Sequence, residues 1–178
     1  MPILVGYIRI VDAINSRVGI AAAWLIFLSV VLCALTAILR YTVGIGYVWM
    51  QELYVACFAV SFTLIAGYAY MKDQHVRVDI ISGKMTRRQK AWAEIIGCII
   101  FLFPWLVVMG LSSWDFVIPA WRIYEPSSQS GGMDGIFLIK TALLSCVFLL
   151  AIQGLAVVAR SIIILKGREE LLPPLPSD

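Results

Sequence analysis

Residues 18–39 read VGIAAAWLIFLSVVLCALTAIL, a run without charged side chains that is bounded by Arg17 and Arg40. At a helical rise of about 1.5 Å per residue, such a run is long enough to cross a hydrocarbon layer about 30 Å thick. Three more uncharged runs follow and, with their flanking turns, predict spans at 53–71, 92–114 and 141–163. The sequence therefore predicts an all-α membrane protein with four transmembrane helices.

The composition agrees with this prediction. Hydrophobic residues make up 61% of the chain and charged residues 14%, whereas charged residues make up about 25% of an ordinary soluble domain. This balance excludes a disordered, secreted or nucleic-acid-binding chain, and the net charge of +3 comes from short basic clusters beside the spans. The first run is longer than the roughly 7–15 apolar residues of a signal peptide, so we expect it to stay in the membrane.

The distribution of Lys and Arg predicts the orientation. Eleven of the 14 basic residues lie before the first predicted span, between the second and third, or around the end of the fourth. Because cytoplasmic loops carry the excess of positive charge, we expect both termini in the cytoplasm. Residues 1–170 are expected to form one membrane domain, and the Pro-rich residues 171–178 an unstructured tail.

The segment before the first span has the pattern of an amphipathic helix. Its apolar positions are Ile3, Leu4, Tyr7, Ile8, Val11 and Ile14, and its polar positions are Arg9, Asp12, Asn15 and Ser16. This spacing predicts a short N-terminal helix that lies on the cytoplasmic membrane surface before the first span, with the polar positions on the opposite side from the apolar ones.

Two local signals shape the third helix. Thr86 and Gln89 have the spacing of a capping box, so this helix is expected to begin near Arg87. Pro104 lies inside the predicted span, where neighbouring helices can satisfy the freed carbonyl. We therefore expect a kink at Pro104 rather than a break.

Glu52 is the acidic residue closest to the second predicted span, three residues after Trp49. One interpretation is a carboxylate at a helix start, stabilised by the helix dipole. A second is a polar contact with a partner helix or with Arg40, since acidic groups at membrane depth seldom face lipid. A third is a proton-coupling carboxylate of the kind that small multidrug exporters use.

Small and amide side chains predict contacts between spans. The second span carries a stripe of small residues that ends at Gly67, and such stripes allow helix backbones to approach closely in lipid. Gln153, with Gly154, is the only strongly polar interior pair of the fourth span, and we expect Gln153 to form an interhelical hydrogen bond.

Cofactor and metal chemistry has little support in the sequence. His75 is the only histidine, which excludes a cytochrome b subunit with two histidine ligands. It lies with Arg77 and Asp79 in the connection after the second span, where an interfacial hydrogen-bonding role is expected. The four cysteines lie one in each span without a C-x-x-C motif. We therefore expect no catalytic, cofactor-binding or metal-ligating residue.

The connection between the third and fourth spans is the most polar stretch on its side. It contains Glu125 and Ser127, followed by the pair Gly131 and Gly132. Two adjacent glycines permit a tight turn or a close backbone approach. This segment is interpreted either as a plain exposed loop or as a docking surface for a periplasmic partner.

Several ordered motifs resemble those of a known family. They are Arg40-Tyr41, Trp49-Met-Gln-Glu52, Gly67-Tyr-Ala-Tyr70, Asp73-Gln-His-Val-Arg-Val-Asp79, Leu102-Phe-Pro104, Ser113-Trp114, Glu125 with Ser127, Gly131-Gly132, Ile139-Lys140 and Gln153-Gly-Leu155. Together they resemble the small permease subunit of tripartite ATP-independent periplasmic (TRAP) transporters, the DctQ-like family. The resemblance covers nearly the whole chain, in order, with the same four-span layout.

This resemblance implies a component of a transporter in the bacterial inner membrane. In that family a periplasmic binding protein delivers an organic acid to a large permease subunit, which carries the sodium and substrate sites. The small subunit packs against the large one and offers part of the docking face. Sodium is therefore expected in the partner and not in this chain.

Carried over by position, the resemblance assigns Trp49 and Glu52 to the entry of the second span. It assigns His75, Arg77 and Asp79 to a cytoplasmic turn that helps to fix the complex. At Met133-Asp134 the chain departs from the Leu-Pro that commonly follows the two glycines in this branch. Two other classes remain open, namely a stand-alone small proton-coupled exporter and a membrane-anchoring subunit of a redox enzyme.

Overall fold

The computed structural model describes residues 1–72 and 85–174 and is helical along most of this length. Its elements in order are α1 (Pro2–Ile38), η1 (Leu39–Val43), α2 (Val48–Met71), α4 (Arg87–Gly97), η2 (Cys98–Leu102), α5 (Phe103–Arg122), α6 (Ile136–Leu165) and η3 (Glu169–Leu171). Within this part of the chain, four continuous helical segments are long and apolar enough to cross a membrane. Each of them contains one of the four predicted spans. His75, Arg77 and Asp79 lie outside the described residues.

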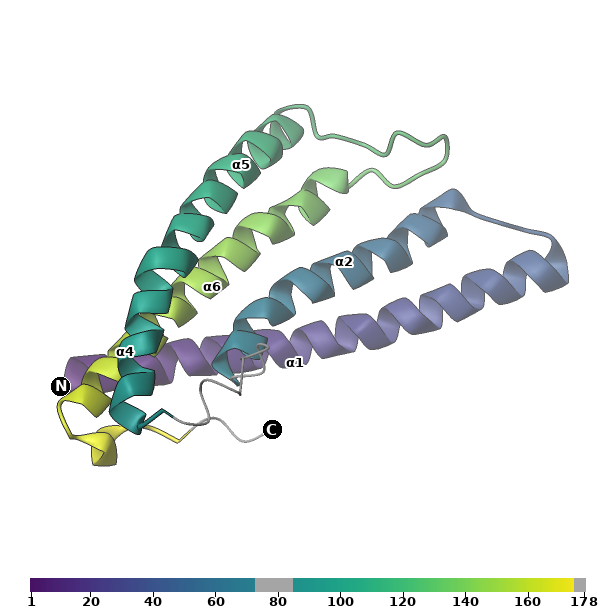
Figure 1. Cartoon of the computed structure of the whole chain (residues 1–178). Coiled ribbons are helices and arrows are strands. Elements are labelled where there is room, and N and C mark those ends of the chain that lie inside the picture. The colour runs from purple at the N-terminus through teal and green to yellow at the C-terminus, as the bar shows by residue number, and fades with distance from the viewer. Residues whose placement is uncertain (73–84, 175–178) are drawn as a thin grey trace.

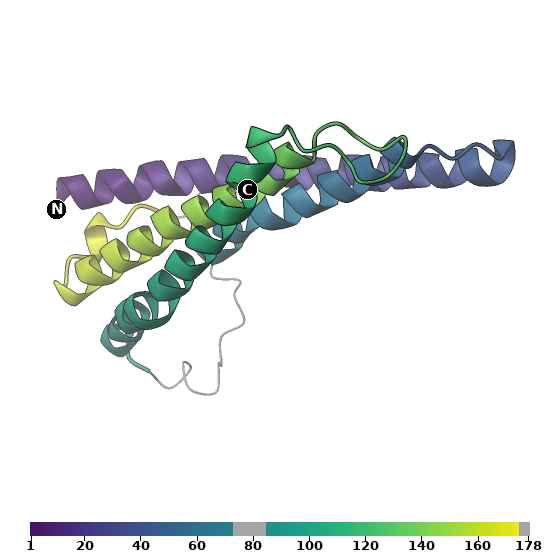
Figure 2. The same cartoon turned by 90° about the horizontal axis from the view of Figure 1, so that it is seen from above.

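Helix α6 is the helix that the others share. It packs against α1, α2, α4 and α5, while α1 packs most extensively against α2. Figure 1 shows α1 and α2 as one antiparallel pair and α5 with α6 as another, inclined to the first. In the view from above, the end of α1 and the start of α2 extend beyond the α5–α6 pair (Figure 2). The N-terminus and the end of α6 lie at the same end of the molecule.

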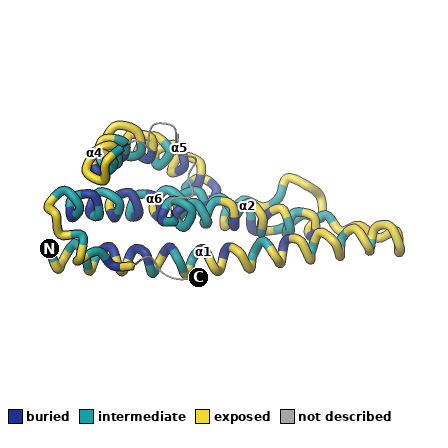
Figure 3. Tube along the Cα trace, turned by 60° about the horizontal axis from the view of Figure 1, so that its bottom comes forward, coloured by how far each residue is buried: buried dark blue, intermediate teal, exposed yellow. Residues whose placement is uncertain are grey.

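The buried residues follow this arrangement. They gather on α6 and on the first half of α1, whereas the far end of α1 is exposed (Figure 3). The core cluster joins Ile8 and Val11 of α1 to Ala156, Ala159 and Ile163 of α6. Large apolar side chains such as Trp24 and Phe101 point outward instead. This distribution fits a bilayer. Lipid tails are as apolar as these side chains, so burial inside the protein gives the side chains no hydrophobic gain.

The N-terminal segment differs from the prediction. Residues 2–17 are not a separate helix but the beginning of α1, which runs without interruption to Ile38. Asp12 and Asn15, predicted on the polar side of an interfacial helix, are 2% and 0% exposed, while Ile3 is 85% exposed. The physical reason for their burial is that polar side chains on α6 form hydrogen bonds with Asp12 and Asn15. At about 1.5 Å per residue α1 is about 55 Å long, so in a bilayer it tilts or projects beyond the hydrocarbon layer.

The structure also defines where the second and third helical segments begin and how the third passes Pro104. The capping box between Thr86 and Gln89 is confirmed, and α4 begins at Arg87 as predicted. A π-helical turn, η2, joins α4 to α5 immediately before Pro104, and such a turn accommodates a residue that cannot donate a backbone hydrogen bond. Helix α2 begins at Val48, so Glu52 lies in its second turn and not at the helix start.

Candidate functional site

A first polar cluster, which we call the outer cluster, joins α2 to the connection between α5 and α6. It consists of Glu52, Ser127, Gly132 and Met133. The Ser127 hydroxyl donates a hydrogen bond to Glu52 Oε1, and the Met133 backbone N–H donates to Glu52 Oε2 at 2.6 Å. The backbone N–H of Ser127 also donates to the carbonyl of Met133 at 2.9 Å. Both carboxylate oxygens of Glu52 are therefore used to hold this connection over the start of α2, where Figure 2 shows it.

The two adjacent glycines serve this cluster in different ways. Gly131 has φ +76°, a left-handed conformation that glycine adopts at little cost. Gly132 needs space instead, because a Cβ atom there would overlap the Ser127 side chain and lie 2.7 Å from Glu52 Oε2. Gly131 thus permits the turn and Gly132 permits the close approach of Glu52.

The other parts of the connection are held by α5 and α6. Lys140 forms an ion pair with Glu125, and its Nζ atom lies 4.0 Å from the centroid of the Phe116 ring. The backbone N–H of Glu125 donates to the Ala120 carbonyl of α5 at 3.0 Å. The indole N–H of Trp121 donates to Thr141 Oγ1 at 2.9 Å and so joins the end of α5 to the start of α6. Hydrogen bonds and an ion pair therefore tie the connection to α2, α5 and α6.

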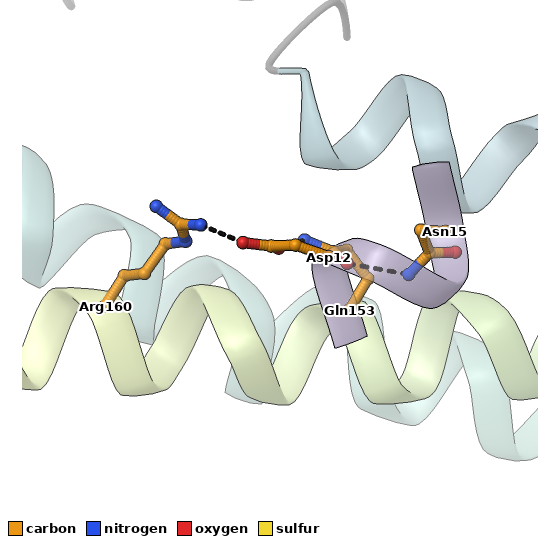
Figure 4. A network of polar contacts seen from close by, with 4 residues as sticks. All are labelled: Asp12, Asn15, Gln153 and Arg160. Atoms are coloured by element: carbon orange, nitrogen blue, oxygen red, sulfur yellow. Dashed lines mark hydrogen bonds and ion pairs between the residues drawn. The ribbon is translucent and has the colours of Figure 1, made fainter. Parts of the chain in front are cut away.

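A second polar cluster, the inner cluster, lies between α1 and α6 and consists of Asp12, Asn15, Gln153 and Arg160 (Figure 4). Arg160 donates to Asp12 Oδ2, and Gln153 Nε2 donates to Asp12 Oδ1 at 3.4 Å. Asn15 Nδ2 in turn donates to Gln153 Oε1 at 2.7 Å. Because the ionised Asp12 can only accept hydrogen bonds, it fixes the orientation of the Gln153 amide and, through it, that of Asn15.

The far end of this chain of hydrogen bonds meets α2. Asn15 Oδ1 is buried without a hydrogen-bond partner. It points at Gly67, where a Cβ atom would overlap it and would also lie 3.1 Å from the Leu149 Cβ. Gly67 therefore occupies a position of close approach, and the groups that come close are Asn15 of α1 and Leu149 of α6.

The structure brings together only some of the residues predicted as functional. Glu52, Ser127 and Gly132 meet in the outer cluster with Gly131 beside them, while Glu125 lies apart with Lys140. Trp49, on the first turn of α2, is 45% exposed and contacts the Tyr47 ring. Gln153 forms its hydrogen bonds in the inner cluster.

Sequence reasoning missed three members of the inner cluster. Asp12 and Asn15 were predicted on the polar side of an amphipathic helix at the membrane surface, and Arg160 was considered only as a basic residue at the end of the fourth span that contributes to orientation. A usable signal was present, because Asp12 and Asn15 share one helix face, and Gln153 and Arg160, two turns apart, share another.

Both clusters use their carboxylates to hold separate segments of the chain together. Each Glu52 oxygen and each Asp12 oxygen accepts a hydrogen bond from a distant segment of the same chain. Among residues 1–72 and 85–174, no three His, Cys, Asp or Glu side chains gather closely enough to hold a metal ion.

Comparison with protein families decides the identity. The family described as tripartite ATP-independent periplasmic transporters, DctQ component, matches residues 28–163, which is more than half of the chain. The chain belongs to the DctQ family. This confirms the resemblance found in the sequence motifs, and it makes the chain a small membrane subunit of a TRAP transporter. Comparison with curated proteins, and likewise with solved structures, gives no match.

Membership of the DctQ family gives the clusters a context. The family consists of transporter components rather than enzymes, and it implies a complex with a large permease subunit and a substrate-binding protein. The matched residues include the whole outer cluster together with Gln153 and Arg160. They begin after Asp12 and Asn15, so the α1 half of the inner cluster precedes the matched segment.

Proposed function

We propose that this DctQ-family chain is the scaffold subunit of a sodium-coupled importer of an organic acid in the bacterial inner membrane. In this proposal the large permease subunit carries the sodium and substrate sites, and both termini of the present chain lie in the cytoplasm. The observation that supports it best is that the carboxylates of both polar clusters accept hydrogen bonds from groups of the same chain. The carboxylates of Asp12 and Glu52 both lie in helical segments that are long and apolar enough to cross a membrane, and both are occupied in joining separate segments of the same chain.

A stand-alone proton-coupled exporter would use its carboxylates differently. Carboxylates that carry protons line a water-filled cavity and exchange partners during transport. Glu52 lines a hollow of about 230 Å³, but both of its carboxylate oxygens accept hydrogen bonds, from Ser127 and Met133. Asp12 is 2% exposed and paired with Arg160. These contacts favour the scaffold over the exporter.

The outward faces of the spans agree with a scaffold role. Exposed apolar side chains such as Phe62 on α2 and Phe101 and Leu111 on the third helical segment supply surface for lipid or for a partner helix. We propose that the large permease subunit packs on part of this surface.

The connection between α5 and α6 is our candidate for docking of the periplasmic binding protein. Lys140 holds Glu125 near its start and Glu52 holds Ser127 and Met133 on the two sides of its tip, while residues 128–131 at the tip are exposed. A loop that is braced at its base presents its tip in one arrangement, which lowers the entropy lost on binding.

The proposal is tested with proteoliposomes that contain this chain, the large permease subunit and the binding protein. We expect uptake of the organic acid when sodium is supplied outside, and loss of that uptake when this chain is omitted. Full uptake without this chain would overturn the scaffold role. A visible absorption spectrum of the purified chain tests the redox-anchor alternative, which requires a bound cofactor.

Docking is tested with Ser128→Trp at the loop tip. We expect this variant to raise the concentration of binding protein needed for half-maximal uptake while leaving the yield of the membrane complex unchanged. Val43→Trp, a bulky change at an exposed position in the other connection on the same side, is the matched control. Equal effects of the two variants would contradict docking at this loop.

A further inference from the structure

At the end of the molecule opposite the outer cluster lies a hollow of about 490 Å³. Its apolar wall includes Val5 of α1 and Leu171 of η3, and Arg9 and Arg168 also line it. The two arginines come from opposite ends of the sequence. A hollow with an apolar wall and two guanidinium groups suits an amphiphilic anion.

The fold builds this hollow by two separate contacts. The packing of Ile8 and Val11 against α6 fixes the first turns of α1 beside the end of α6. After α6, Gly167 adopts φ +66°, and the chain turns so that Leu172 packs against the same core cluster. Arg168 and Leu171 lie within this turn, so both are carried toward α1.

The electrostatic character of the hollow is positive. In the described part of the chain, Arg9 and Arg168 form no ion pair. The nearby carboxylates of Asp12 and Glu169 are paired with Arg160 and Arg87, respectively. Glu170, the remaining acidic residue of η3, is exposed.

The beginning of α1 adds to this positive charge. No side chain caps its first turn, and Met1 and Pro2 of this turn line the hollow. The positive end of the helix dipole therefore faces the same space as the two guanidinium groups.

We propose that this hollow binds an anionic phospholipid, with the headgroup phosphate between Arg9 and Arg168 and part of an acyl chain against the apolar wall. Guanidinium groups recognise phosphate through paired hydrogen bonds. Basic pockets at the ends of membrane helices are typical binding sites for anionic lipid headgroups. A free phosphate ion would leave the apolar wall uncovered, so the wall favours a lipid. This site is independent of the transport role proposed above.

The test uses the full chain, purified in detergent and titrated with phosphatidylglycerol or phosphatidylcholine while native mass spectrometry counts bound lipid. We expect preferential binding of one phosphatidylglycerol. The double change Arg9→Gln with Arg168→Gln is expected to weaken this binding about thirtyfold, and each single change about fivefold. Equal binding of the two lipids would overturn the proposal.

The matched control is Arg17→Gln with Lys166→Gln. It removes the same charge from the same end of the molecule, at positions that do not line the hollow. We expect it to change lipid binding less than threefold. If both double variants lose binding equally, the attraction is a general effect of surface charge and the specific site is refuted.

A third variant blocks the hollow without changing its charge. A Cβ atom at Gly6, which lines the hollow, meets no atom within 4 Å, so Gly6→Leu can fold and place its side chain in the hollow. We expect this variant to keep the circular dichroism spectrum and melting temperature of the parent and to lose phosphatidylglycerol binding. Retained binding of phosphatidylglycerol to this variant would overturn the site. If millimolar inorganic phosphate displaces phosphatidylglycerol from the parent protein, the hollow is a site for free phosphate and the lipid proposal is refuted.

Discussion

The Arg160 guanidinium donates a hydrogen bond to the Asp12 carboxylate and thereby joins α6 to α1 across 148 residues of sequence. The Asp12 side chain is 3% exposed and that of Arg160 is 19% exposed. A pair with so little access to water depends on both members, because removal of one leaves the other charged and unpaired.

The ion pair should therefore behave as a unit. We expect Asp12→Asn to lower the stability of the purified subunit by about 3 kcal/mol, because Arg160 is left without its counter-charge. Arg160→Gln should cost a similar amount. The double variant should cost clearly less than the sum of the two single variants, and thermal melting in detergent gives the coupling between them. Additive losses would show that the two side chains do not interact.

Gly67 should be intolerant of any side chain. Gly67→Ala is expected to cost about 1–3 kcal/mol, since the new methyl group overlaps Asn15 Oδ1 and displaces α1 from α2. Asn15→Ala in the same chain should recover part of this loss. Gly97→Ala is the matched control, because a Cβ atom there meets nothing within 4 Å. Melting curves of the parent and of these three variants measure the losses of stability. Equal losses for Gly67→Ala and Gly97→Ala would contradict the close approach at Gly67.

The spans could be predicted from the sequence because the bilayer thickness sets the length of an uncharged run. The start of α4 could be predicted because the capping box of Thr86 and Gln89 is a local signal. The two polar clusters could not. Glu52 and Ser127 are 75 residues apart, and neither segment contains a local sequence signal that identifies the other as its partner.

The face assigned to Asp12 and Asn15 illustrates a further limit. A polar face on one helix is compatible with lipid headgroups or with polar groups on a second helix. The periodicity of α1 alone does not distinguish these surroundings. Only the position of α6, with Gln153 and Arg160 on the facing side, shows that this face is internal.

The outer cluster should control the order of the connection between α5 and α6. We expect Glu52→Gln to increase hydrogen exchange in residues 123–135, since a neutral amide accepts more weakly from Ser127 and Met133 than a carboxylate does. Global stability should fall by only about 1–2 kcal/mol. Asp134→Asn, a change of the same kind at an exposed loop position, should leave exchange unchanged. A uniform increase along the whole chain would point to general unfolding instead.

The two adjacent glycines should respond differently to asparagine. Asparagine tolerates the left-handed conformation, so Gly131→Asn should cost about 1 kcal/mol or less. Gly132→Asn should disrupt the outer cluster, because its Cβ atom would overlap Ser127 and approach Glu52. Limited proteolysis of the connection would reveal the difference as faster cleavage in the Gly132 variant only. Equal cleavage of both variants would show that space at Gly132 is not needed.

The central position of α6 has a consequence for how the protein is made. Ribosomes synthesise α6 after α1, α2, α4 and α5, yet all four pack against it. Until α6 enters the bilayer, Asp12 and Asn15 have neither Arg160 nor Gln153 to bind, so the contacts that hold the start of α1 in place cannot form. Insertion of α6 therefore completes the folding of helices that were inserted before it, and it couples maturation of this subunit to completion of its translation.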